Sequence, residues 1–130
     1  MSALDAIERF YDARAAGDID AVGQFIAPDV VWREPSVGEH MGELLGRDAV
    51  LDMMRRAQAT TGGTFSLRVK EGVAVDGHCS VVVQWSATKN GRTLDGRELA
   101  TFTVTHGVIT FAQFLPENVR HDEAFWASSL

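Results

Sequence analysis

The chain has 130 residues, 45% of them hydrophobic and 23% charged, which is typical of one soluble globular domain. Its 12 basic and 18 acidic residues give a formal net charge of −6, which argues against a general nucleic-acid-binding protein because such proteins need a clustered basic surface. No apolar run approaches the roughly 18 residues of a membrane span, and no secretory signal is visible. The single cysteine, Cys79, cannot form an internal disulfide. We expect one domain over residues 1–130, located in the cytoplasm.

Apolar residues recur at helical spacing in the first half of the chain. The spacing predicts a helix over 2–16 that ends at Gly17, and a third helix over about 47–60. Between them, a short second helix is expected to begin at the capping residue Asp18 and to stop at Pro28.

A short strand and a loop are expected between the second and third helices. The strand covers 30–32 and is closed by Glu34-Pro35, and residues 36–46 contain three glycines and predict a mobile loop. We also expect a last helix around 119–127.

From residue 64 onward, apolar and polar residues alternate, which is typical of strands. Asp-Gly, Asn-Gly and His-Gly turns divide this half into four antiparallel strands, at about 64–75, 78–89, 92–105 and 108–115. Helices followed by a run of strands predict an α+β domain.

The turns predict which residues share a face of the sheet. A two-residue turn at 90–91 places Trp85 opposite Gly96. A two-residue turn at 106–107 would place Phe102 opposite Phe111. The face covered by helices is then mostly apolar, with one carboxylate and one amide embedded in it; its members are Val81, Val83, Trp85, Glu98, Ala100, Phe102, Phe111 and Gln113.

A regular turn between the first two of these four strands would bury positive charge. An uninterrupted two-residue hairpin at 76–77 would drive two cations inward, with Arg68 against Trp85. Burying an unpaired cation costs several kcal/mol in practice. We therefore predict a β-bulge or an odd-length loop near 72–79, which returns Leu67 to a position opposite Trp85.

The opposite face of the sheet is rich in threonine and is predicted to carry Leu99, Ala112 and Phe114. These apolar residues would otherwise form an exposed patch, so we expect a homodimer through this outer face.

Three segments carry a family resemblance. They are FYDARAAGD at 10–18, APDVVW at 27–32 and LGRDAV at 45–50. With the order of helices and strands, they resemble the nuclear transport factor 2-like superfamily, in particular its SnoaL-like and ketosteroid-isomerase-like branch. The resemblance implies a cone-shaped α+β barrel, with three N-terminal helices packed on a curved, mostly antiparallel sheet.

The resemblance also implies roles for individual residues. Glu34, just before Pro35, matches the carboxylate base of ketosteroid isomerases. The two oxyanion donors of those enzymes correspond to Phe10 and Ala100, which have no donor group. Tyr11 lies one residue along the helix, about 100° around it, and is not expected to replace the first donor. Classical ketosteroid isomerase activity is therefore not expected.

Three residues are candidates for catalysis. Glu34 lies on the same side of the strand as Trp32, and this apolar neighbour would raise the pKa of Glu34 toward that of a general base. Alternatively, Glu34 is a carboxylate at the rim, bonded to a loop amide or to Arg33 or Arg47. Glu98 is a second acid or a hydrogen-bond acceptor for the substrate, or else it forms a buried ion pair with Arg47 or Arg14. His40, in the glycine-bearing loop, is either an acid, base or lid residue or a solvated histidine.

Aromatic, amide and thioether side chains are candidates for binding an apolar ring system, or else belong to the core. They are Trp32, Trp85, Phe102, Phe111, Gln113 and Met54. The histidines show no metal-ligand spacing, and no glycine-rich nucleotide motif is present, so neither a metal nor a cofactor is expected.

The leading hypothesis is a cofactor-independent SnoaL-like enzyme that isomerises or cyclises an apolar, ring-bearing carbonyl compound, with Glu34 as base. The alternative is a domain of the same fold that binds a small molecule without reacting, or an accessory subunit.

Overall fold

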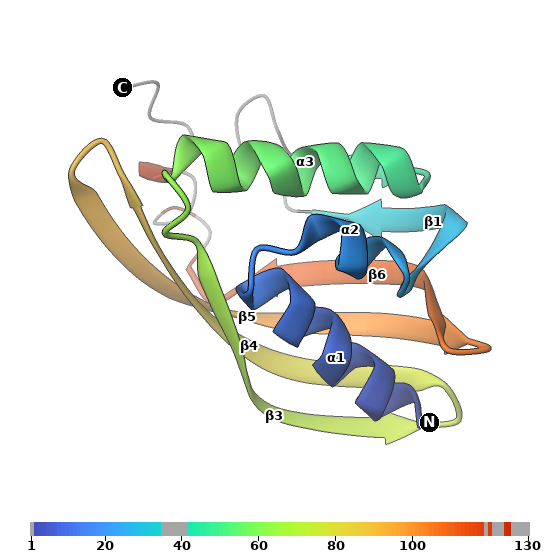
Figure 1. Ribbon diagram of the computed structural model, residues 1–130. Helices are drawn as coiled ribbons and strands as arrows, with labels where there is room; N and C mark the ends of the chain where they lie inside the picture. The colour runs from blue at the N-terminus through green and yellow to red at the C-terminus, as the bar shows by residue number, and fades with distance from the viewer. Residues whose placement is uncertain (1, 35–41, 119, 121–123, 126–130) are drawn as a thin grey trace.

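Three helices lie over one face of a curved, open, six-stranded sheet (Figure 1). This computed structural model describes residues 2–34, 42–118, 120 and 124–125. The helices are α1 (Ala3–Ala15), α2 (Ile19–Gly23) and α3 (Arg47–Thr60). The strands are β1 (Ile26–Arg33), β2 (Glu43–Leu45), β3 (Ser66–Val75), β4 (His78–Lys89), β5 (Arg92–Thr105) and β6 (Val108–Pro116).

The strand order is β2-β1-β6-β5-β4-β3, and every neighbouring pair is antiparallel except β1 and β6. The α+β class and the four-stranded meander are confirmed. Of the helices in the described part of the chain, none is long and apolar enough to cross a membrane.

Local capping explains where the first two helices begin. Ser2 and Asp5 form a reciprocal capping box at the start of α1, and the Asp18 side chain accepts from the Ala21 amide at the start of α2. The predicted extension of the second helix to Pro28 is wrong, because β1 begins at Ile26 and runs through the proline.

One strand lies inside the predicted glycine-bearing loop. β2 pairs antiparallel with β1, with Leu44 opposite Trp32. The sequence pattern missed β2 because three residues are too few to show an alternation. Residues 35–41 of that loop lie outside the described residues, as do most of those in the predicted last helix, of which Arg120, Ala124 and Phe125 are helical.

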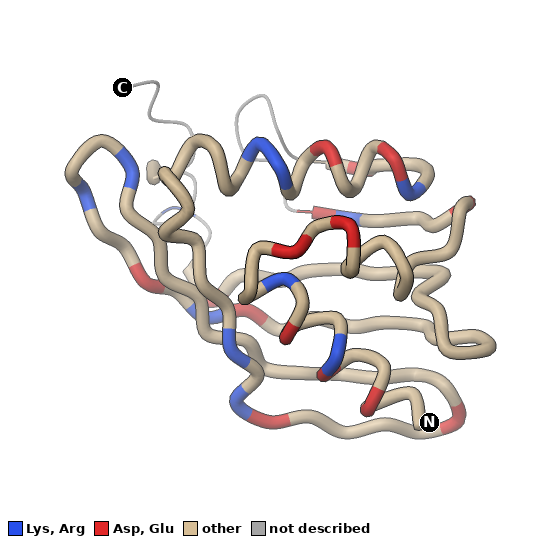
Figure 2. The backbone as a smooth tube through the Cα atoms, in the orientation of Figure 1, with Lys and Arg blue, Asp and Glu red and all other residues tan. Residues whose placement is uncertain are grey.

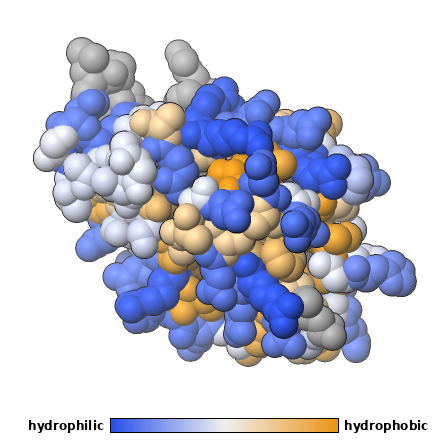
Figure 3. All heavy atoms as spheres, viewed as in Figure 1, coloured by the Kyte–Doolittle hydropathy of each residue, from blue (hydrophilic) through white to orange (hydrophobic). Residues whose placement is uncertain are grey.

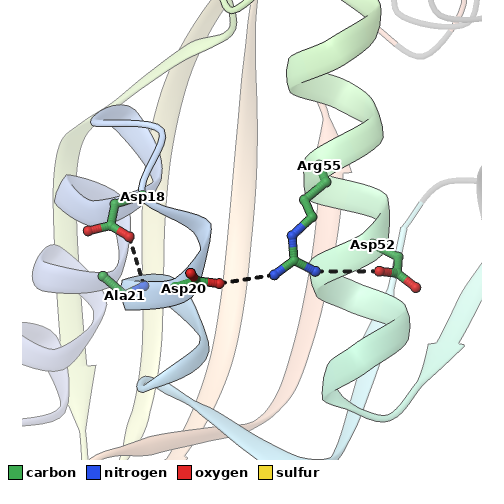
Figure 4. Close-up of polar contacts among 5 residues, drawn as sticks. All are labelled: Asp18, Asp20, Ala21, Asp52 and Arg55. Carbon is green, nitrogen blue, oxygen red and sulfur yellow. Dashed lines mark hydrogen bonds and ion pairs between the residues drawn. The ribbon is translucent and has the colours of Figure 1, made fainter.

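Exposed ion pairs connect α2 and α3 at the surface. Arg55 of α3 contacts Asp20 of α2 at 3.2 Å and Asp52 of its own helix at 3.5 Å (Figure 4). All three side chains are about half exposed or more, so these pairs contribute little to stability. α1 and α3 carry both basic and acidic residues, whereas the strands are mostly uncharged (Figure 2), and the face in Figure 3 shows only small apolar areas between hydrophilic ones.

The predicted offset between β3 and β4 is confirmed, with its position corrected. Leu67 lies opposite Trp85, and the ladder skips one residue at Lys70. The turn itself is a regular two-residue turn, in which Asp76 and Gly77 both have positive φ. The bulge therefore lies two residues before the predicted window of 72–79, and it keeps Arg68 outside the core.

The predicted register of β5 and β6 is wrong. The His106-Gly107 turn does join two directly paired residues, but the ladder then skips Thr110. Phe102 consequently lies opposite Ala112 rather than Phe111, and the inward side of β6 carries Ala112 and Phe114 instead of Phe111 and Gln113.

The same shift changes the composition of the outer sheet face. Arg33 lies over the Phe111 ring at 5.3 Å, and Leu99 and Leu115 are 40% and 53% exposed. Ala112 and Phe114, which the dimer prediction used, are buried on the other side. The homodimer stays a prediction, now with Phe111 and Leu115 in place of those two residues.

Gly96 leaves the space that Trp85 occupies on the inner face of the sheet. A Cβ atom on Gly96 would lie 2.7 Å from Trp85 Nε1 and 2.8 Å from Cε2. The Trp85 ring in turn stacks on Phe65 at 5.9 Å with an interplanar angle of 8°.

We expect Gly96→Ala to lower the free energy of unfolding by about 1–3 kcal/mol, because the methyl group displaces a packed indole. Urea denaturation measures the change. Gly23→Ala is the matched control: its Cβ would meet the two terminal methyl groups of the flexible Leu51 side chain, at 3.2 and 4.0 Å, and the substitution favours the helix, so it should leave stability unchanged or raise it. Equal effects of the two substitutions would contradict this account of Gly96.

Candidate functional site

Glu34 is held at the end of β1 by its neighbour on the same side of the strand. The Trp32 indole Nε1 donates to Glu34 Oε1 at 2.9 Å, and the Glu34 amide donates to the Gly42 carbonyl at 2.9 Å. Trp32 is fully buried and Glu34 is partly buried. Desolvation raises the pKa of Glu34, while the bond from Trp32 and the charge of Arg14 act against the rise.

The first helix places two polar side chains in the interior. Tyr11 and Arg14 continue the buried stripe formed by Ile7 and Phe10, and they are only 2% and 6% exposed. The Arg14 guanidinium lies over the Phe65 ring, 5.1 Å from its centroid. Phe65 is itself stacked on Trp85, so Arg14 caps an aromatic stack that reaches across the sheet.

Four ionisable groups interact in this interior region. Burial lowers the pKa of Arg14, and the charges of Glu34, Tyr11 and Glu98 act against that decrease. Burial also raises the pKa of Tyr11 well above its usual value, and Glu98 and Glu34 raise it further. The arginine remains charged and the tyrosine remains protonated across the ordinary pH range. One cation and one hydroxyl of α1 thus interact electrostatically with a carboxylate just after β1 and a carboxylate of β5, and we call these four residues the acid–arginine cluster (Tyr11, Arg14, Glu34 and Glu98).

The Tyr11 hydroxyl is fully buried, yet it has no hydrogen-bond partner among the described residues. A buried hydroxyl without a partner usually costs about 1–3 kcal/mol. Such exceptions in a folded protein call for a functional or solvent explanation.

The aromatic residues next to the cluster are tightly packed on one another. Trp32 contacts Phe114 at 4.9 Å between ring centroids, and Phe102 lies 6.1 Å from both Phe10 and Tyr11. Trp32, Phe102 and Trp85 are each at most 3% exposed. These ring contacts and this burial are typical of a packed core, and the core lies next to the acid–arginine cluster.

The structure separates the predicted site residues into three groups. Trp32, Glu34, Trp85, Glu98 and Phe102 lie on the inner side, and Met54 of α3 is fully buried there. Phe111 and Gln113 lie on the outer face because of the bulge at Thr110, so the prediction that they face the site is wrong. His40 lies outside the described residues.

Sequence reasoning set Tyr11 aside as a replacement for the first oxyanion donor, and it named Arg14 only as a possible ion-pair partner of Glu98. Ile7, Phe10 and Arg14 are separated by three and four residues, so the arginine falls on the apolar stripe of its helix. A charged residue on such a stripe is a usable signal, because it must find compensation in the interior. Phe10 and Ala100, at the donor positions of the ketosteroid isomerases, are both fully buried apolar residues.

A cleft of about 360 Å³ lies between α1 and β3. Its described lining includes Tyr11 together with Glu8 and Asp12, but neither Glu34 nor Glu98. Within the described ranges, no group of three or more histidine, cysteine or acidic side chains is placed to hold a metal ion.

Known proteins share both sequence and fold with this chain. A family model described as the SnoaL-like domain matches residues 7–112. An uncharacterized protein of Mycobacterium tuberculosis is 30% identical over 125 residues, which is 95% of each chain.

Two solved structures show the same fold. A Xanthomonas campestris protein of unknown function with a cystatin-like fold superposes with a TM-score of 0.90 at 24% identity, covering 98% of this chain and 100% of the other. IdmH of Streptomyces antibioticus, for which a polyketide cyclase activity has been proposed, gives a TM-score of 0.79 at 20% identity, covering 97% and 99%.

We expect Tyr11→Phe to raise the free energy of unfolding by about 1 kcal/mol, because it removes a buried hydroxyl that has no partner. Chemical denaturation measures the effect. Thr61→Val is the matched control: the buried Thr61 hydroxyl donates to the Ala57 carbonyl at 2.8 Å, so its removal should destabilise the protein. Destabilisation by Tyr11→Phe would show that the hydroxyl has a stabilising partner.

Glu34→Gln should stabilise the protein in a pH-dependent way. Because the folded-state pKa of Glu34 is raised, the folded protein binds its proton more tightly than the unfolded chain does, and stability falls as pH rises from the unfolded pKa through the folded pKa. The melting temperature of the variant should therefore exceed that of the wild type at neutral pH. The difference should disappear below the unfolded pKa of about 4.3. A difference that grows toward low pH would contradict a raised pKa.

Proposed function

We propose that this chain, which belongs to the SnoaL-like domain family of the nuclear transport factor 2-like superfamily, is a cofactor-independent enzyme that moves a proton on an apolar, ring-bearing carbonyl compound. Glu34 is the general base, and the reaction is an isomerisation or a cyclisation. The observation that carries this proposal is the partly desolvated Glu34 carboxylate held by the Trp32 indole.

The environment of Glu34 supports its role as a base. Desolvation brings its pKa closer to neutral pH, which makes the carboxylate a stronger proton acceptor. The indole fixes Oε1, and no described residue donates a hydrogen bond to Oε2, so this oxygen is available to a substrate C–H group. The charge of Arg14 acts against the rise in the pKa of Glu34 and so favours the ionised carboxylate.

Glu98 is proposed as the second acid of the site. It lies on the inner face of β5, opposite Val83, and its charge acts on both Tyr11 and Arg14. A second carboxyl group could return the proton at another position of the substrate, as an isomerisation requires. The activity proposed for the structural neighbour IdmH is of the same general kind.

Non-catalytic binding of an apolar ligand is the second candidate function. The observation that favours it is the pair Phe10 and Ala100, two fully buried apolar residues where ketosteroid isomerases have their oxyanion donors. Such a domain would bind carbonyl compounds without accelerating exchange of their protons.

Proton exchange at carbon tests the enzyme directly. We expect the protein to accelerate deuterium incorporation next to the carbonyl group of 2-tetralone or 1-indanone in D₂O, followed by nuclear magnetic resonance. Glu34→Gln should slow the catalysed rate by about 10²–10⁴-fold, because it removes the base and retains the shape.

Glu43→Gln is the matched control, since that carboxylate is exposed and pairs with Arg33 on the outside of the sheet. Its exchange rate should equal that of the wild type. Binding of the ketones without any exchange that depends on Glu34 would favour the binding domain instead.

A further inference from the structure

We propose that Arg14 and Tyr11 together bind an anionic oxygen, and that the ligand of this protein is a carbonyl compound acidic enough to be held as its enolate. This inference rests on the proposed function, because it names the substrate class of the same site. It is tested below by a binding measurement that does not require turnover.

Arg14 is a buried cation with unused donors. Its guanidinium group carries five N–H donors, and the side chain is 6% exposed. It makes no hydrogen bond or ion pair with any described residue, and its identified close contact is the face of the Phe65 ring. The charges of Glu34 and Glu98 act on it from beyond ion-pairing distance, which leaves the donors free for a ligand.

Tyr11 adds a second unused donor on the same face of the same helix. The two residues are three positions apart, so their side chains are neighbours. The Tyr11 hydroxyl is buried and unpartnered, and it interacts electrostatically with Arg14. Two adjacent buried side chains that both offer free donors fit one oxygen atom, or one delocalised group, that carries negative charge.

The proposed reaction creates an anion that this pair can bind. When Glu34 takes the proton, the bond between carbon and hydrogen next to the carbonyl group breaks and an O–H bond forms on Glu34. The electron pair of the broken bond forms a carbon–carbon double bond, and the carbonyl π pair moves onto oxygen. The total charge is unchanged, and one negative charge moves from the Glu34 carboxylate to the substrate oxygen.

Neither donor is suited to protonate that oxygen. The guanidinium group does not lose its proton in proteins, and burial holds the pKa of Tyr11 well above its usual value. The pair therefore stabilises the enolate as an anion, and the proton returns to carbon from a carboxyl group. Compounds whose enolates delocalise charge, such as ring-bearing 1,3-dicarbonyls, fit this site best.

The binding of 4-nitrophenol tests the inference, because this ring compound carries an anionic oxygen when ionised and its phenolate absorbs at a longer wavelength than its neutral form. We expect the protein to bind the phenolate and to lower the pKa of the bound phenol. Glu34→Gln should bind the phenolate more tightly, since a nearby negative charge has been removed.

Tyr11→Phe should weaken phenolate binding about 10-fold or more, the loss expected for a hydrogen bond to a charged acceptor. Arg14→Gln should weaken it further and shift the preference toward neutral phenol, and Arg14→Lys should restore part of the affinity. Arg33→Gln is the matched control, because Arg33 lies over Phe111 on the outer face, and it should bind as the wild type does.

Phenolate affinity in Tyr11→Phe within two-fold of the wild type would overturn the inference. Preference of the wild type for the neutral phenol would overturn it equally. Tyr11→Phe removes a single oxygen atom and is expected to fold, so it decides the outcome even where an Arg14 variant does not fold. One combined result would contradict only the anion site and still support the proposed enzyme. In that result, proton exchange at carbon depends on Glu34, but phenolate binding does not change on substitution of Tyr11 or Arg14. Proton exchange that does not depend on Glu34, together with phenolate binding that does depend on Tyr11 and Arg14, would contradict the proposed enzyme and support the anion site.

Discussion

The burial of one positive charge, that of Arg14, constrains much of the interior. A guanidinium group can enter an apolar core only when other groups compensate for its lost hydration. Here the compensation comes from three different elements: the Phe65 ring just before β3, Glu34 after β1 and Glu98 in β5. Each also fixes something else, because Phe65 stacks on Trp85 and Glu34 accepts from Trp32. The charge thereby links the first helix to both halves of the sheet.

The interior also shows a conflict between stability and function. An aromatic wall around Phe102 is packed as closely as a structural core, whereas Tyr11 beside it holds a buried hydroxyl without a partner. Packing of the first kind stabilises the fold, and an unpartnered donor destabilises it. A rigid apolar wall lowers the effective dielectric around the neighbouring donors and carboxylates, which would strengthen their interaction with the proposed ligand.

Two β-bulges decide which side chains reach that interior. The bulge at Lys70 keeps cations of β3 outside, and the bulge at Thr110 turns Ala112 and Phe114 inward. The first could be inferred from the sequence, because the regular register would have buried Arg68 against Trp85. The second could not, since either register of β6 places one phenylalanine and one smaller residue on the inner face, and neither buries a charge.

The sequence by itself determined helices α1 and α3, the start of α2, the three hairpin turns, the fold class and the placement of Trp32 and Glu34 on one side of a strand. These features depend on residues close together in the chain, where capping, glycine turns and periodicity act directly. The tertiary structure alone decided that Tyr11 and Arg14 meet the charges of Glu34 and Glu98, and that Phe111 and Gln113 face outward. Those outcomes depend on how the volumes and charges of distant segments fit together in one core, and no local pattern contains that information.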